Sequence, residues 1–212
     1  MGIPVILYGK SGSGKSRSLK NFAPDEITLI NVESKPLPFR GKFKYTVCSD
    51  SYEKITAALN KTPSKTVVID DAGYLLTNMF MRGHSARGGS STFDLYNDIG
   101  DKFWSLIRHI KTLPEDMIVY IVMHEEENDN GIIKLKMLGK LLEQKVCVEG
   151  LVTIVIRCMC DDSRHYFRVH NSGNDITKTP EEMFENSEID NDLKFVDETI
   201  RKYYELEGEN KE

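Results

Sequence analysis

Short apolar runs rich in β-branched residues alternate along this chain with longer stretches in which apolar residues recur every three or four positions. The short runs predict buried β-strands, and the longer stretches predict amphipathic helices. The predicted strands span residues 3–8, 27–32, 45–47, 66–71, 117–123, 152–158 and 165–169. The predicted helices span residues 17–22, 51–60, 72–81, 93–111 and 191–206.

The order of these elements predicts the fold class. Buried strands that alternate with helices indicate an α/β domain in three layers, built on a mainly parallel sheet. The last two strands are joined by the turn 161–163 and predict an antiparallel hairpin at the sheet edge. Two segments, 82–92 and 125–130, are too polar to pack and predict loops, and the structure of 131–144 is left open.

The length and the charge distribution refine this picture. With 212 residues and 40% hydrophobic content, the chain is expected to form one domain. The net charge is −5, but residues 181–212 hold twelve acidic and four basic residues, which leaves residues 1–180 at +3. We therefore expect a mildly basic core at 1–180 and an acidic helical appendage of the same domain at 181–212.

Apolar content and cysteine usage indicate a cytoplasmic protein. No run of about 18 apolar residues exists, which argues against a spanning helix and a membrane partner. Because two residues precede the first predicted strand, we expect no signal peptide. The four cysteines are sparse, and we interpret them as reduced, buried thiols. Cys158 and Cys160 with His165 and His170 do not have a standard zinc-site spacing.

The most specific motif lies between the first strand and the first helix. It matches the phosphate-loop pattern G-x-x-x-x-G-K-[ST] and consists of Gly9, Lys10, Ser11, Gly12, Ser13, Gly14, Lys15 and Ser16, followed by Arg17. Glycines let the backbone N–H groups approach a triphosphate closely. Lys15 is expected to neutralise the β- and γ-phosphates, and the Ser16 hydroxyl to bind Mg²⁺. The guanine-reading N-K-x-D pattern is missing at 60–63, which favours ATP over GTP.

A second motif supplies a carboxylate for the same metal ion. Asp70 ends an apolar strand fifty-five residues after Lys15, which is the Walker B arrangement for holding Mg²⁺. Because the carboxyl ends of parallel strands share one edge of a sheet, we expect Asp70 to lie next to Ser16.

Hydrolysis of ATP also needs a group that orients or deprotonates water. Three carboxylates are candidates: Glu33 at the end of the second strand, Asp71 after Asp70, and Glu125 in the second polar segment. Glu33 is favoured because it has the longer reach. His124, at the end of a further strand, is a candidate sensor of the γ-phosphate.

The order of these features resembles RecA-like P-loop NTPase cores, and more closely the compact phage-encoded RecA-like ATPases that promote single-strand annealing. The matching stretches are GKSGSGKS, INVES, VVIDDAG, IVMHEEE, GLVTIVIRC and KTPEEMF. The resemblance implies DNA-stimulated ATP hydrolysis and binding of single-stranded DNA through two loops, 82–92 and 125–136. The DNA-binding residues it implies are Arg82, His84 and Arg87 in the first loop and Lys134 and Lys136 in the second.

The same resemblance implies partners. It suggests a homo-oligomer in the form of a ring or short filament, with Arg168 or Lys178 reaching a neighbour's nucleotide. It also implies a single-strand-binding protein as a partner and the host cytoplasm as the location.

Two other functions compatible with a phosphate loop stay open. A nucleotide kinase would need an arginine-rich lid, for which Arg82 and Arg87 alone are few. A non-hydrolysing, ATP-gated scaffold or helicase-loading module would bind ATP through the same loop without DNA-stimulated turnover. An ATPase assay with and without single-stranded DNA separates these functions.

Overall fold

The computed structural model describes the whole chain except residues 85–90, 140–145 and 207–212, and the side chains of 91–93. Its mixed sheet has the strand order β3-β2-β4-β5-β1-β7-β8-β9, with β6 paired to β5. The strands are β1 (Ile3–Gly9), β2 (Ile27–Asn31), β3 (Tyr45–Cys48), β4 (Thr66–Asp70), β5 (Ile118–Glu127), β6 (Ile133–Leu135), β7 (Ile154–Asp161), β8 (Arg164–Arg168) and β9 (Glu188–Asp190).

The neighbouring strands β3, β2, β4, β5, β1 and β7 all run parallel. Strand β8 is antiparallel to β7, and β9 is antiparallel to β8. Strand β5 lies between β1 and β4, so the strand before the phosphate loop and the strand that ends in Asp70 are not adjacent. The predicted fold class is confirmed: a three-layer, RecA-like P-loop core with a mainly parallel sheet and an antiparallel C-terminal hairpin.

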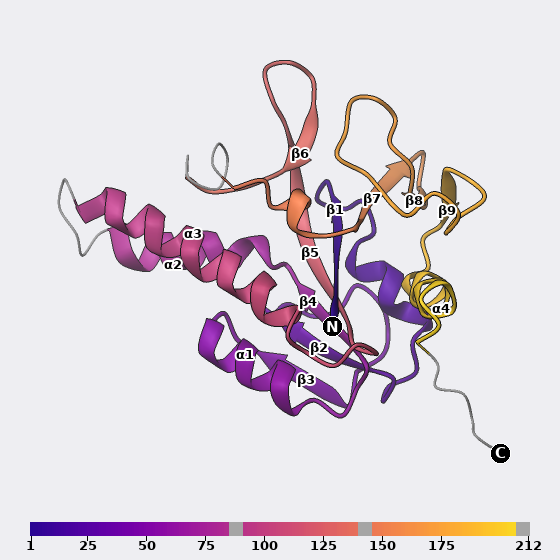
Figure 1. The fold of residues 1–212 in the computed structure, drawn as a ribbon, viewed down its shortest axis with the longest axis horizontal. Coiled ribbons are helices and arrows are strands. Elements are labelled where there is room, and N and C mark those ends of the chain that lie inside the picture. Colours follow the sequence, from indigo (N-terminus) through magenta and orange to yellow (C-terminus); the bar gives the residue numbers. More distant parts are fainter. Residues whose placement is uncertain (85–90, 140–145, 207–212) are drawn as a thin grey trace.

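Helices cover both faces of the sheet (Figure 1). They are η1 (Ser16–Asn21), α1 (Tyr52–Lys61), α2 (Gly73–His84), α3 (Ser91–Ile110), η3 (Glu149–Leu151) and α4 (Leu193–Tyr203). Alternation along β1 sends Ile6 and Tyr8 into the core under α1, α2 and α3, and Val5 and Leu7 into the core under η1 and α4. The near-continuous apolar runs of the central strands follow from this burial on two faces.

The acidic C-terminal region contributes its helix to this second core. Leu193, Val196 and Ile200 of α4 are fully buried and share a cluster with Leu19 of η1. Asp192 caps α4 by accepting hydrogen bonds from the backbone N–H groups of residues 194 and 195. The boundary at residue 180 stays a prediction.

Several predicted boundaries were wrong. Strand β5 does not end before His124; it continues to Glu127 and pairs antiparallel with β6, because the chain reverses at 128–132 and returns alongside it. Residues 82–84 and 91–92 of the expected loop are helical, since α2 runs to His84 and α3 begins at Ser91, and residues 85–90 lie outside the described residues. The segment after the phosphate loop is a six-residue 3-10 helix.

The cysteine prediction was also wrong for three of the four residues. Cys158 is buried, but Cys48, Cys147 and Cys160 are exposed. Cys48 lies on the edge strand β3, where alternate side chains face solvent. In the part of the chain that the structure describes, no helix has both the length and the apolar character needed to cross a membrane.

Candidate functional site

The candidate site lies at the edge where the parallel strands β1, β4 and β5 end. The Ser16 hydroxyl donates to the Asp70 carboxylate, with Oγ at 2.8 Å from Oδ2 and 3.1 Å from Oδ1. The two predicted Mg²⁺ ligands are therefore in contact, although their strands are separated by β5. Among the described residues no group of three or more His, Cys, Asp or Glu side chains could hold a metal ion. A hydroxyl and one carboxylate fit Mg²⁺, which completes its octahedral shell with phosphate oxygens and water.

The phosphate loop wraps around the side chain of Lys15. Its ammonium group donates to the carbonyl oxygens of Gly9 at 2.9 Å and Lys10 at 2.7 Å, and the residue is only 6% exposed. Gly12 and Gly14 have φ angles of 79° and 104°, in the left-handed region that favours glycine. Burial lowers the pKa of Lys15 from its ordinary value, and nearby carboxylates oppose this effect.

A pocket of about 350 Å³ opens at this loop. Six of the predicted nucleotide-binding residues line this pocket: Ser11, Gly12, Gly14, Lys15, Ser16 and Arg17. Asp70, Asp71 and His124 line the same pocket, so the structure brings these three predicted site residues together with the loop. Segment 35–38 and His165 complete the wall, and neither was predicted from the sequence.

Asp70 is almost fully buried at 7% exposure. Burial raises its pKa to about 6, with Asp71 acting in the same direction and the Ser16 hydrogen bond opposing it. A bound divalent cation would favour the charged carboxylate again, because a metal ion is the largest local charge in such a site.

Asp71 lies directly after β4 with a φ angle of 60°, which is uncommon for a residue with a side chain. Its carboxylate accepts a hydrogen bond from Lys35 Nζ at 2.8 Å. The same Nζ lies 4.7 Å from the centre of the Tyr74 ring, and Tyr74 meets His124 edge to face at 5.9 Å. Burial lowers the pKa of His124, and the charge of Lys15 acts in the same direction. His124, which itself lines the pocket, is therefore linked to Lys35 through the ring of Tyr74.

The other two candidate carboxylates do not line this pocket. Glu33 lies two residues after β2, outside the residues that line the pocket, and accepts a hydrogen bond from Asn78 Nδ2 at 2.7 Å. Asn78 also donates to Asp50, which pairs with Arg82 at the end of α2. Glu125 forms a bidentate ion pair with Arg157, at 2.8 and 2.9 Å. Of the three carboxylates proposed to activate water, Asp71 is the one on the pocket wall.

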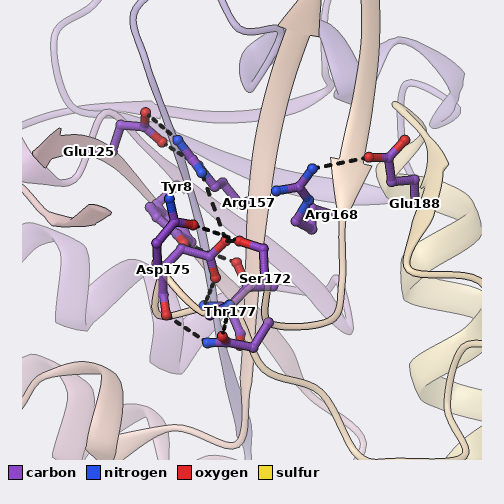
Figure 2. Close-up of polar contacts among 11 residues, drawn as sticks. Tyr8, Glu125, Arg157, Arg168, Ser172, Asp175, Thr177 and Glu188 are labelled. Carbon is purple, nitrogen blue, oxygen red and sulfur yellow. Dashed lines mark hydrogen bonds and ion pairs between the residues drawn. The ribbon is translucent and has the colours of Figure 1, made fainter. Parts of the chain in front are cut away.

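Figure 2 shows the polar cluster around Arg157. The Glu125 and Arg157 side chains are 3% and 10% exposed, and Arg157 Nη1 lies 3.8 Å from the buried carboxylate of Asp175. Asp175 in turn accepts hydrogen bonds from the Ser172 hydroxyl at 2.6 Å and the Thr177 N–H at 2.9 Å. These contacts anchor the β5–β6 hairpin to β7 and to the loop that follows β8.

The residues predicted to act between subunits make contacts within the chain. Arg168 donates to Glu188 at 3.1 Å across the β8–β9 pair (Figure 2). The backbone of Lys178 bonds to that of Val155 in both directions. A role of either side chain in a neighbouring subunit stays a prediction.

The predicted DNA-binding residues lie on two separate protrusions. Arg82 and His84 are exposed at the end of α2, where His84 stacks on Phe80 at 5.1 Å, and Arg87 lies outside the described residues. Lys134 is on the β5–β6 hairpin and pairs with Glu126 at 3.2 Å, and Lys136 follows β6. The tip of α2 and the hairpin extend in different directions from the sheet (Figure 1).

Sequence reasoning missed the contacts that β8 and the segment before α4 make with the phosphate loop. His165 Nδ1 lies 2.8 Å from the Ser13 carbonyl oxygen, which Cys158 Sγ also contacts at 3.2 Å. Asn191 accepts a hydrogen bond from Arg17 at 3.2 Å. A Cβ on Gly14 would lie 2.8 Å from the His165 ring. No local pattern signals these contacts, because the partners are about 150 to 175 residues apart.

Comparison with known proteins identifies a family to which the chain is similar. A family model described as an AAA domain matches residues 1–184, which include the phosphate loop, Asp70, Asp71, His124 and strands β1 to β8. No curated protein sequence matches the chain.

Proposed function

Because the chain belongs to the AAA domain family, whose members are in general nucleotide-binding ATPases, we propose that it hydrolyses ATP and binds single-stranded DNA to promote strand annealing. The observation that carries the ATPase activity is the contact of Ser16 with Asp70 beside the buried ammonium group of Lys15. These three side chains provide the charge and the metal ligands that phosphoryl transfer to water requires.

The roles in hydrolysis follow from position in the pocket. Lys15 would neutralise the phosphates, and Ser16 and Asp70 would hold Mg²⁺, which would supply further stabilisation of their negative charge. Asp71 is the carboxylate placed to take the proton from the attacking water, because it lines the pocket next to Asp70. Glu33 could do so only after it leaves Asn78. His124 is the proposed γ-phosphate sensor.

Chain connectivity supports coupling between the nucleotide and DNA. Helix α2 begins two residues after Asp71 and carries Arg82 and His84 at its far end. Strand β5 carries His124 and continues directly into the hairpin that holds Lys134. Each proposed DNA-binding protrusion therefore follows closely in the chain after a residue that lines the pocket, Asp71 before α2 and His124 in β5, so a change at the γ-phosphate can reach it through regular structure.

The remaining parts of the proposal rest on the resemblance to phage-encoded annealing ATPases. They are a role in phage recombination in the host cytoplasm, assembly into a ring or short filament, and cooperation with a single-strand-binding protein.

The test is ATP hydrolysis measured with and without single-stranded DNA, with Lys15→Ala as the inactive reference. We expect DNA to stimulate turnover of the wild type and not of the variant. Stimulation by a nucleoside instead would identify a kinase. ATP binding without any turnover would identify a scaffold or loading module.

The DNA loop is tested separately by titrating labelled oligonucleotide at several salt concentrations with ATP present. Each lost phosphate contact lowers the slope of log affinity against log salt by about 0.7, so Arg82→Ala with Arg87→Ala should flatten it by roughly one unit or more. The matched control is Arg108→Ala, which removes an exposed arginine on α3, outside the proposed DNA-binding loop. An unchanged slope in the double variant would place DNA elsewhere, such as on Lys35, Arg40, Lys42 and Lys44.

A further inference from the structure

Lys35 is a second cation on the pocket wall, outside the phosphate loop. Its backbone is held at a defined place by the buried side chain of Asn31, the last residue of β2. The Asn31 amide donates to the Lys35 carbonyl oxygen at 2.7 Å and its Oδ1 accepts from the Lys35 N–H at 3.2 Å. This two-way clamp turns the chain back after β2 and directs segment 35–38 along the pocket.

The ammonium group of Lys35 is bound only weakly in this position. It donates to Asp71 at 2.8 Å and lies over the Tyr74 ring, yet the Lys35 side chain remains 52% exposed. An ion pair this open to solvent contributes about 0–1 kcal/mol, so little free energy is needed to exchange its partner. The side chain is charged at neutral pH, and the Asp71 hydrogen bond raises the pKa of Lys35 further above its ordinary value.

The position of the pair indicates which phosphate it faces. Ser16 and Asp70 are in contact and would hold the Mg²⁺ that accompanies a bound triphosphate, so the γ-phosphate would lie at their side of the pocket. Asp71 directly follows Asp70, and both line the pocket with Lys35. Lys35 and Asp71 are therefore at the γ-phosphate end of the site, whereas Arg17 and His165 border the loop near Gly14.

We propose that Lys35 also distinguishes ATP from ADP, beside the sensor role proposed for His124: it leaves Asp71 to contact the γ-phosphate of ATP and returns to Asp71 when that phosphate is lost. The γ-phosphate carries more negative charge than a single carboxylate and offers three acceptor oxygens to the flexible ammonium group. The exchange frees the Asp71 carboxylate only when ATP is present. This inference rests on the proposed ATPase function and assigns a residue to it that no sequence motif indicated.

The experiment compares the affinities of a non-hydrolysable ATP analogue and of ADP, both with Mg²⁺, in the full chain. In Lys35→Met we expect the dissociation constant of the analogue to rise about tenfold, since a charge-assisted contact is lost, and that of ADP to change less than about twofold. Lys35→Arg keeps the cation and should retain most of the discrimination. Lys42→Met, which removes an exposed lysine outside the pocket lining, should leave both affinities unchanged.

The outcomes separate this inference from the function on which it rests. If the wild type binds neither nucleotide, the ATPase proposal fails and the role of Lys35 fails with it. If the wild type binds both, and Lys35→Met weakens ATP analogue and ADP equally or weakens neither, only the assignment of Lys35 is wrong. Circular dichroism of each variant verifies that it is folded. The substitutions at Lys35 should not disturb the fold, because this side chain is half-exposed.

Discussion

Strand β4 begins at the buried Thr66 and ends at the buried Asp70. A buried aspartate lies at each end, Asp197 of α4 against Thr66 and Asp70 itself, and the two have different hydrogen-bond partners. At the start, Asp197 of α4 accepts hydrogen bonds from the Thr66 hydroxyl at 2.9 Å, the Tyr120 hydroxyl at 3.1 Å and Arg201 at 2.7 Å. At the other end, the side-chain hydrogen bonds that Asp70 accepts in the described structure come from Ser16 alone. Burial raises the pKa of both aspartates, but only Asp197 has a cation in direct contact.

This difference in hydrogen-bond partners gives the two ends of the strand different roles, one structural and one functional. A buried carboxylate with a full set of donors fastens α4 to the sheet, and little is left for it to bind. A buried carboxylate with one hydroxyl partner keeps free acceptor capacity and carries a cost of desolvation, which a metal ion can remove. Substitutions at the first end should therefore change stability, and substitutions at the second should change activity.

The largest effect is expected at the Asp197 end. Arg201→Met should lower the free energy of unfolding by about 3–5 kcal/mol, because it leaves Asp197 buried without its cation. Urea unfolding measures this loss, and Lys202→Met, on an exposed neighbour in α4, serves as the control. Nucleotide affinity below the unfolding range should not change. A strong loss of affinity in the folded variant would contradict the structural role of this end.

The next effect separates Asp71 from Glu33, two of the three carboxylates proposed to activate water. Asp71→Asn should lower the turnover of ATP about 100-fold with ATP binding retained, since the amide cannot accept the proton. Glu33→Gln should have a small effect, because Glu33 is hydrogen-bonded to Asn78 outside the pocket lining. Single-turnover kinetics distinguish chemistry from binding. The reverse order of effects would return the role to Glu33, the carboxylate favoured by its reach.

The smallest effect is a gain in stability at the Asp70 end. The pKa of Asp70 is about 6 when folded and 3.8 at its ordinary value, so the folded state binds more protons between these values and loses stability as pH rises through them. Asp70→Asn removes this loss and should stabilise the fold by roughly 2–3 kcal/mol above pH 6, with the gain shrinking toward pH 4. Urea unfolding of both proteins at pH 8 and pH 4, without nucleotide, measures it. A gain that is independent of pH would contradict a desolvated carboxylate at Asp70.

Much of the site could be predicted from the sequence, because its central residues belong to short motifs that are continuous along the chain. The phosphate loop spans eight consecutive residues, and Asp70 follows a recognisable apolar strand, so parallel pairing is enough to place Ser16 beside it. The long helices were found from their periodicity, with errors at their ends. Strands β6 and β9 were missed because each has three residues and forms only through its partner.

The sequence by itself determined the α/β class, the nucleotide chemistry and the edge of the sheet where this chemistry lies, since these depend on short-range patterns and on the direction of buried strands. Only the tertiary structure decided that Lys35 holds Asp71, that Glu33 turns to Asn78 and that His165 rests on the phosphate loop. These choices depend on which distant side chains come within hydrogen-bonding distance after packing. A sequence pattern records the kind of residue at each position but not the neighbours that packing gives it.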